Sequence, residues 1–411
     1  MVMDQSVMGT EAMVVSPHYL ASAAGARILA KGGNAIDAAV AVSACLAVVY
    51  PHMTGLGGDA FWLIYSRKDQ AVQGYNGSGR SGYQVTRERF AHLEAIPERG
   101  VLSAITVPGM VDSWDAVLKR YGRLSLADVL EPAITYAEQG FPCSTSQAAF
   151  TERAASLLAS MGISGQIFLP GGRPPNPGER FVQKQLASSL KTIAHKGRDA
   201  FYTGELAREM VRGIQKQGGL LTMDDFADHH GDWVEPLSVT YRDYQIYQVP
   251  PNSQGFVALM VLNMLEQCDF SQIEHGSFEY YHLLIEAIKL AFQDRDQVLT
   301  DPDFYPIPLD KLLSKEYARQ LFEQITWDRA LQLEAGRSGQ DTAYAAVMDG
   351  EGNAVSFIQS LYYDFGSAVV AGETGILLQN RGSFFSLAPH HVNRLEPRKR
   401  TFHTLMAAMA C

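Results

Sequence analysis

Cysteine is scarce in this chain, and its placement limits what the protein can bind. The 411 residues contain four cysteines whose spacing matches no metal site: Cys45, Cys143, Cys268 and Cys411. Two adjacent histidine pairs, at 229–230 and 390–391, are poor metal clamps, because neighbouring side chains on a strand point to opposite faces. We therefore expect no metal, and the sparse cysteines suit a reducing compartment.

Long basic runs and long apolar runs are also missing. The formal net charge is −10, and the triplet Arg398-Lys399-Arg400 is too short to suggest a nucleic-acid surface. The longest apolar stretch, residues 38–50, is too short to span a bilayer, and we interpret it as a buried helix that contains Cys45. The first residues lack a basic segment followed by an apolar one. We therefore expect no signal peptide, no membrane association and a cytoplasmic location.

The composition that remains is typical of a large globular protein of mixed structure. Hydrophobic residues make up 46% of the chain and charged residues 19%, which is enough for a substantial core. Periodicity predicts helices at residues 18–31, 35–49, 110–121, 125–139, 181–196, 204–217, 255–267, 277–297 and 310–324. It predicts strands at residues 11–15, 60–66, 70–75, 237–241, 244–249, 342–348, 354–360 and 367–371. Periodicity alone does not give the topology.

Thr342 opens the most informative segment, a predicted hairpin that follows a glycine-containing loop. Cleavage of the Asp341–Thr342 bond would leave Thr342 with a free α-amine beside its own hydroxyl. An α-amine titrates at about 7.7–8.0 and can serve as a general base at neutral pH. Threonine is also a good strand former, so a threonine at the start of a hairpin strand is ordinary by itself.

Motifs recur in a fixed order along the chain. They lie at residues 32–41 (GGNAIDAAVA), 54–58 (TGLGG), 107–109, 126–134, 138–142, 342–366 and 370–378. The pair Gly57-Gly58 fits no phosphate-binding loop or dinucleotide fingerprint and is predicted to allow close backbone packing. The ordered set resembles the gamma-glutamyltranspeptidase family over nearly the whole chain.

The resemblance implies an α+β fold, the four-layer αββα sandwich of N-terminal-nucleophile hydrolases, built as a single domain over residues 1–411. Residues 1–341 would be the large-subunit region and residues 342–411 the start of the small-subunit region. The two pieces would associate after processing, and a higher oligomer is left open. Compared with the family, the second piece is short and lacks a later Gly-Gly turn that forms the oxyanion hole. We therefore expect a C-terminally incomplete fold, from either a fragment or a degenerate member.

The same resemblance implies a set of site residues. It places the autocleavage between Asp341 and Thr342, the nucleophile at Thr342 and a supporting hydroxyl at Ser360. The arginine that binds the substrate α-carboxylate aligns with Ser78, and Arg80, two residues later, is the candidate to replace it. Further substrate-binding positions of the family align with Tyr362, Arg381, Phe384, His403 and Thr404.

Two of those positions depart from the family in a chemically telling way. Phe384 stands where the family carries an acid that binds the substrate ammonium, and Arg381 replaces a Gln or Glu. Loss of the acid removes a charge-assisted hydrogen bond to an amino group, and the arginine adds attraction for an anion. The site is therefore predicted to lean toward anionic or apolar acyl groups, similar to the cephalosporin-acylase-like branch of the family.

Three functions follow. The first is a self-processing N-terminal-threonine amide hydrolase and acyltransferase that cleaves gamma-glutamyl compounds such as glutathione, without a cofactor. The second keeps this mechanism but acts on glutaryl- or cephalosporin-like side chains. The third is a truncated, non-catalytic family member. In the first two cases, the partner is a small-molecule amide substrate.

Overall fold

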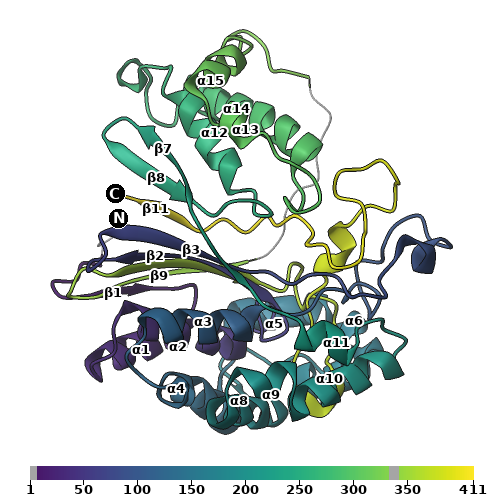
Figure 1. Cartoon of the computed structure of the whole chain (residues 1–411). Coiled ribbons are helices and arrows are strands. Elements are labelled where there is room, and N and C mark those ends of the chain that lie inside the picture. The colour runs from purple at the N-terminus through teal and green to yellow at the C-terminus, as the bar shows by residue number, and fades with distance from the viewer. Residues whose placement is uncertain (1–6, 333–341) are drawn as a thin grey trace.

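The computed structural model of the chain describes residues 7–332 and 342–411, and two antiparallel sheets lie at its centre (Figure 1). The larger sheet has the order β1 (Met13–Val15), β9 (Ala343–Met348), β10 (Ala354–Ser360), β2 (Asp59–Ser66), β3 (Ala71–Gly77) and β6 (Asp232–Val234). The smaller sheet has the order β11 (Ala408–Ala410), β8 (Tyr244–Gln248) and β7 (Leu237–Tyr241). A separate pair joins β4 (Phe141–Pro142) to β5 (Arg180–Phe181).

One group of helices covers the outer side of the larger sheet. It comprises α1 (Tyr19–Ala30), α2 (Ala35–Val49), α3 (Met110–Tyr121), α4 (Leu126–Gln139), α5 (Thr145–Arg153), α6 (Ala155–Ser160), α7 (Ile163–Phe168), α8 (Lys184–Lys196), α9 (Arg198–Tyr202), α10 (Glu205–Lys216) and α11 (Met223–Ala227). Every residue of α2 is buried, as its apolar sequence favours. Asp37 fixes the start of α2: its carboxylate accepts the backbone N–H groups of Asn34, Arg123 and Leu124. The motif at 32–41 is therefore a capped, buried helix.

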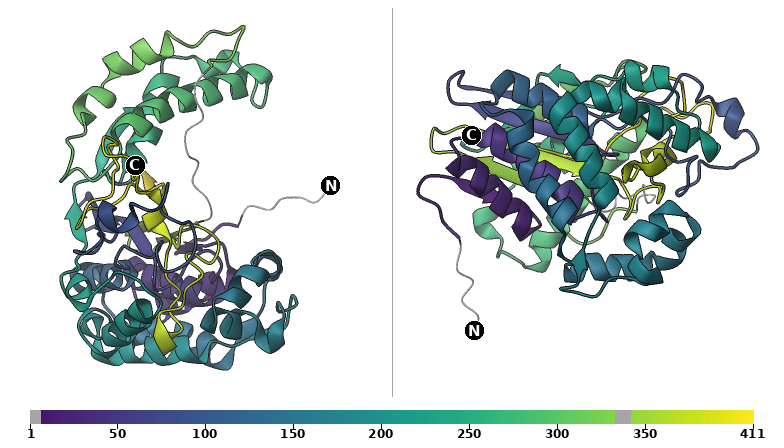
Figure 2. Two further views of the ribbon diagram at one scale, coloured as in Figure 1. Left: turned by 90° about the vertical axis from the view of Figure 1, so that its right-hand side faces the viewer. Right: turned by 90° about the horizontal axis from the view of Figure 1, so that it is seen from below.

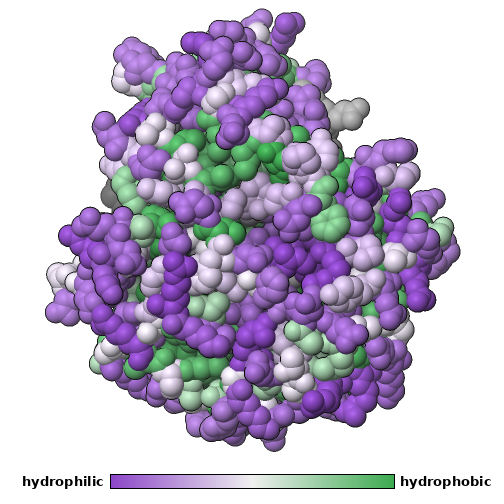
Figure 3. Space-filling model, in the orientation of Figure 1, coloured by the Kyte–Doolittle hydropathy of each residue, from purple (hydrophilic) through white to green (hydrophobic). Residues whose placement is uncertain are grey.

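A second group of helices lies beyond the smaller sheet, on the opposite side of the molecule (Figure 2). It comprises α12 (Gly255–Leu265), α13 (Phe278–Val298), α14 (Leu309–Leu312) and α15 (Lys315–Phe322), which share one apolar core with Leu237 and Tyr241 of β7. Between the sheets, Phe61, Leu63 and Ile358 pack against Val249, Leu405 and Ala407. On the face shown in Figure 3, the surface is largely hydrophilic, with apolar side chains gathered over this upper helical group.

Most predicted elements are present, and the mixed helix and sheet content is confirmed. The predicted helices at 35–49 and 110–121 and the strands at 237–241 and 354–360 match in their bounds. Cys45 is buried, as predicted, and Ser125 forms a capping box with Asp128 at the start of α4. The assignment to the four-layer sandwich, the single domain with its division at 341–342 and the incomplete C-terminus remain predictions.

Two predicted elements are wrong. Residues 367–371 do not form a strand, because the segment turns repeatedly through positive φ angles, at Phe365, Gly366 and Ala368, and makes only isolated bonds to residues 376–378. The predicted helix at 310–324 is divided, because Ser314 caps a new helix by accepting the N–H of Tyr317. No helix within the described ranges is both long and apolar enough to cross a membrane.

Candidate active site

Thr342 directly precedes β9, the strand that lies between β1 and β10 in the larger sheet. Ala343 pairs with Gln359 of β10, so Thr342 comes beside Ser360 at the end of the same ladder. Thr342 is partly buried and Ser360 is fully buried. The Ser360 hydroxyl oxygen accepts the backbone N–H of Tyr362 at 2.7 Å. Asp341, the other residue of the predicted cleavage site, lies outside the described residues.

The turn of the β9–β10 hairpin fixes this register. Asp349 Oδ1 accepts the N–H groups of Glu351 and Asn353 at 3.0 and 2.9 Å, which closes the turn. Its Oδ2 accepts the N–H of Ala35 at 2.9 Å, which ties the turn to the first residue of α2. The hairpin that carries Thr342 and Ser360 is therefore anchored to the most buried helix of the fold.

Gly57 and Gly58 let the chain approach the site closely. A Cβ atom on Gly58 would lie 2.3 Å from the carbonyl oxygen of Ser360, and one on Gly57 would lie 2.1 Å from that of Leu377. Both distances are too short for any side chain. The prediction that these glycines allow close backbone packing is confirmed.

Asp59 is a buried acid that the sequence reasoning missed. It is fully buried and lies directly opposite Ser360 in the β10–β2 ladder. Its Oδ1 accepts the N–H groups of Gly79 and Gly109 at 3.2 and 3.0 Å and the side-chain amide of Gln379 at 3.1 Å. An acid at the start of an otherwise apolar strand, just after the glycine pair, was the signal that could have revealed it.

His403 lies against the other oxygen of this carboxylate. Its Nε2 is 3.1 Å from Asp59 Oδ2, and its ring meets the edge of Phe61 at a centroid distance of 5.0 Å. Burial, reinforced by the positive charge of Arg381, lowers the pKa of His403 to about 4, so the imidazole is neutral at pH 7. The adjacent Thr404 is only partly buried, and its backbone carbonyl accepts the side-chain amide of Gln254.

Arg381 is a buried cation with unused hydrogen-bond donors. Its side chain is 1% exposed, and within the described part of the chain its Nε and Nη1 have no hydrogen-bond partner. The guanidinium carbon lies 4.4 Å from the ring centroid of Tyr362 and 5.5 Å from that of Phe384. Burial lowers its pKa to about 10, so it stays charged at neutral pH. The aromatic faces offset part of the cost of burying this charge.

Tyr362 and Phe384 form the wall next to Arg381. Their ring centroids are 4.3 Å apart, and the ring centroid of Phe384 is also 4.3 Å from that of Phe402. Beyond Phe384 lies a cavity of about 280 Å³, lined by Arg295, Asp296, Leu299, Ser386, His391 and Phe402. Tyr362, Arg381 and Phe384 therefore form one contiguous group, which connects to Ser360 through Tyr362.

Arg80 is paired with two acids. Its Nη2 is 3.4 Å from an Asp232 carboxylate oxygen and 3.7 Å from one of Asp303, and Arg400 also binds Asp232, at 2.6 Å. Ser78 is fully buried and donates to Asn76. A role of Arg80 in holding a substrate carboxylate would require these ion pairs to open.

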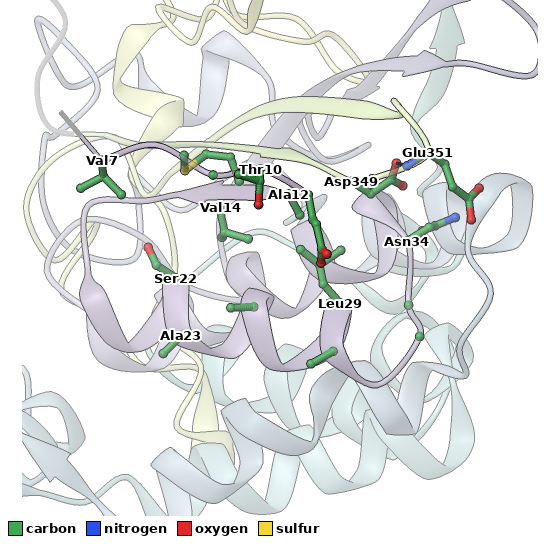
Figure 4. A pocket seen from close by; sticks show the side chains of 18 of the residues that line it. Val7, Thr10, Ala12, Val14, Ser22, Ala23, Leu29, Asn34, Asp349 and Glu351 are labelled. Atoms are coloured by element: carbon green, nitrogen blue, oxygen red, sulfur yellow. Dashed lines mark hydrogen bonds between the residues drawn. The ribbon is translucent and has the colours of Figure 1, made fainter.

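A larger cavity, of about 890 Å³, is remote from these residues. It lies between the segment before β1, the helix α1 and the turn of the β9–β10 hairpin, with Val14, Leu29 and Asn34 in its wall (Figure 4). It contains none of the predicted site residues, so size alone does not locate the chemistry. Within 7–332 and 342–411, no group of three or more His, Cys, Asp and Glu side chains could hold a metal ion.

Comparison with known proteins assigns the family. The sequence model of gamma-glutamyltranspeptidase matches residues 21–411. The chain belongs to the gamma-glutamyltranspeptidase family. It is 66% identical to the glutathione hydrolase-like YwrD proenzyme of Bacillus subtilis (strain 168), over 100% of this chain and 78% of that protein. It is 38% identical to an oxamate amidohydrolase proenzyme of Klebsiella pneumoniae, over 99% of this chain and 78% of the relative.

The fold agrees with this membership. A cephalosporin acylase from Bacillus halodurans superposes with a TM-score of 0.92 at 39% identity, over 99% of this chain and 77% of that one. As a member of the gamma-glutamyltranspeptidase family with acylase relatives, the chain is an enzyme of the N-terminal-nucleophile hydrolase type. The non-catalytic alternative is not favoured. Relatives named as proenzymes support processing into two subunits.

Proposed function

We propose that the chain is the precursor of an amide hydrolase and acyltransferase whose nucleophile is Thr342. The observation that carries this proposal is the position of Thr342, directly before β9 and beside the buried Ser360. Attack of the Thr342 hydroxyl on the preceding carbonyl would shift the acyl group from nitrogen to oxygen, and water would release residues 1–341. The new α-amine of Thr342 would then be a general base next to its own hydroxyl.

The catalytic cycle uses the same two groups. The α-amine takes the proton of the Thr342 hydroxyl as the oxygen attacks the substrate carbonyl, and it returns that proton to the departing amine. The acyl group is left as an ester on Thr342. Water then releases it as a carboxylic acid, or an amine acceptor takes it in transfer. Ser360 would support the Thr342 hydroxyl or amine, and no cofactor takes part.

Strand pairing in the larger sheet should hold the two pieces together after cleavage. β9 and β10 follow the cleavage site, yet they lie between β1 and β2, which precede it. The β10–β2 ladder by itself covers seven residues of β10, from Ala354 to Ser360. Separation would break these ladders and expose the core beneath them, so we expect a tight complex.

The substrates we propose first are gamma-glutamyl compounds such as glutathione. Support comes from the family and from the relative that is 66% identical over the aligned residues and is named a glutathione hydrolase-like proenzyme. A gamma-glutamyl group carries an α-ammonium, for which an acid is the natural partner. Phe384 offers no such acceptor.

A second substrate class is favoured by Arg381. Its two unpaired, buried donor nitrogens match a carboxylate on an acyl group that has no amino group, such as glutaryl. Relatives of the chain include an oxamate amidohydrolase and an acylase, and oxamate is itself the amide of a dicarboxylic acid. This class keeps the Thr342 mechanism and changes only the acyl group.

Trapping of the acyl-enzyme tests the mechanism. Processed protein is mixed with a gamma-glutamyl or glutaryl anilide, quenched in acid and digested. We expect the added acyl mass on the peptide that begins at Thr342, and no turnover by Thr342→Ala. An adduct on another residue, or undiminished turnover by Thr342→Ala, would refute the assignment of the nucleophile.

A further inference from the structure

The segment that follows Ser360 has an unusual backbone. Tyr362, Phe365, Gly366 and Ala368 all have positive φ angles, of 87°, 57°, 52° and 61°. Such angles are rare for residues other than glycine, so the backbone is strained at Tyr362, Phe365 and Ala368 and persists there only because the surroundings hold it. Tyr362 is the strictest case, because a bulky side chain is the least suited to this region. Something outside the segment must therefore hold it.

Arg99 is one side chain outside the segment that holds it. Its Nη1 donates to the carbonyl oxygens of Asp364 and Gly366, and its Nη2 binds the Asp364 carboxylate. Next to it, the N–H of Gly100 donates to the carbonyl of Ser367 at 2.8 Å. The planar fork of an arginine suits several acceptors at once, which the single ammonium of a lysine cannot reproduce.

Contacts run from Arg99 to the buried cation of the site. The Arg99 guanidinium lies 5.3 Å from the ring centroid of Tyr363, and that ring stacks on Tyr362 at 4.2 Å. The guanidinium carbon of Arg381 in turn lies 4.4 Å from the ring centroid of Tyr362. A second link joins the same places, because Asn380, next to Arg381, accepts the N–H of Tyr363 and donates to the carbonyl of Glu98.

We propose that Arg99 is a positioning residue for acyl-group selection: it clamps residues 362–367 and, through Tyr363 and Tyr362, sets the direction of the Arg381 guanidinium. Arg99 is partly exposed, and its guanidinium binds Asp364 and Gly366. The inference rests on the proposed function only in that the group read by Arg381 belongs to an acyl substrate.

Binding of two small acids by the purified chain tests this role without turnover. Glutarate and valerate have five carbons each, and glutarate has a carboxylate where valerate has a methyl group. The ratio of their dissociation constants, measured by calorimetry, isolates the second carboxylate. We expect the wild-type chain to favour glutarate at least about tenfold, the effect of one charge-assisted hydrogen bond. Arg381→Met should abolish the preference.

Substitutions of Arg99 then test whether it sets the direction of the Arg381 guanidinium. Arg99→Ala should reduce the ratio to near one, and Arg99→Lys should leave an intermediate value. Arg173→Ala is the matched control, because Arg173 also binds a carboxylate, that of Glu179, and a backbone carbonyl, that of Pro174, and should leave the ratio unchanged. General loosening of the fold would weaken both acids together, and thermal unfolding midpoints would reveal it.

Two results would overturn the inference: an Arg99→Ala chain, folded by its unfolding midpoint, that keeps the wild-type ratio, or a wild-type chain without any preference. If Arg99→Ala does not fold, the folded Arg99→Lys chain decides, and an undiminished ratio there counts against the clamp. These failures differ from failure of the proposed function, which would appear as turnover by Thr342→Ala and would leave the glutarate ratio as it is.

Discussion

Ser360 and Asp59 lie directly opposite each other on β10 and β2, and both are fully buried. The acid is held by backbone N–H groups of two loops and by Gln379, and it lies beside His403. The strand end that carries Ser360 is therefore backed by a buried carboxylate. We therefore expect Asp59 to help fix the strand end that lies beside the proposed nucleophile.

Replacement of this acid should destabilise the fold and impair the site together. Asp59→Asn keeps one acceptor oxygen but turns an amide group toward Gln379 or His403, which leaves polar groups poorly paired. We expect a loss of about 1–3 kcal/mol in the free energy of unfolding, measured by urea titration. Asp69→Asn, on the exposed turn between β2 and β3, is the control. Unchanged stability of Asp59→Asn would contradict the structural role.

Acid should weaken the fold through His403. Its pKa is about 4 in the folded chain, below the ordinary 6.5, so the unfolded chain binds more protons between these values. The contribution of neutral His403 is complete above pH 6.5 and is lost as the pH falls toward 4. At pH 5 the loss from this residue alone should be about 2 kcal/mol.

Other buried histidines also have lowered pKa values, so the share of His403 must be found by comparing the wild type with a His403 variant. Burial also lowers the pKa values of His18, His52 and His229. The fall in unfolding free energy between pH 7.5 and pH 5 is measured for the wild type and for His403→Gln. The variant should lose less. An equal fall in both would mean that His403 does not carry the predicted share.

Substrate choice should respond to a new acid at position 384. Phe384→Asp restores an acceptor for a substrate ammonium, and it should raise kcat/KM for a gamma-glutamyl anilide relative to a glutaryl anilide. A charged hydrogen bond of about 1.5–3 kcal/mol corresponds to a change of roughly 10- to 150-fold. Phe384→Leu, which removes the ring without adding charge, is the control.

The same pair of substrates tests Arg381. Arg381→Gln should lower kcat/KM for the glutaryl anilide more than for the gamma-glutamyl anilide, because only the former depends on the carboxylate contact alone. If neither Phe384→Asp nor Arg381→Gln moves the ratio, residues 381 and 384 do not read the acyl group. The acylase-like interpretation would then be abandoned.

The hairpin turn should matter for processing. Asp349→Ala removes the acceptor for Glu351, Asn353 and Ala35 at once. We expect a loss of about 1–3 kcal/mol in stability and slower cleavage, followed as the rate at which the fragment from residue 342 appears. Glu351→Ala removes only an exposed ion pair with Arg123 and should change little. Equal effects of the two substitutions would contradict the anchoring role of Asp349.

The sequence predicted the elements that have strong local signals. The helix at 35–49 and the strand at 354–360 are apolar runs with clear ends, and both were located to the residue. The neighbourhood of Tyr362, Arg381 and Phe384 followed from the family alignment, and the structure places their side chains in contact. Their roles remain proposals.

The rest depends on long-range contacts that no local pattern encodes. Arg99 is an unremarkable surface arginine in sequence, yet it binds residues more than 260 positions away. Asp59 of β2 and His403, in the segment before β11, come together from distant parts of the chain. The predicted strand at 367–371 was wrong for the opposite reason. Its residues favour a strand locally, but turns pack the segment against residues 376–378 instead.

Intact mass and N-terminal sequencing of the purified chain show whether Thr342 cleaves its own precursor. We expect two pieces, residues 1–341 and 342–411, with Thr342 as the first residue of the second. Thr342→Ser should still be cleaved, and Thr342→Ala should stay whole. A fragment that begins at residue 342 in the Thr342→Ala chain would contradict self-processing by Thr342, and so would a wild-type chain that never divides.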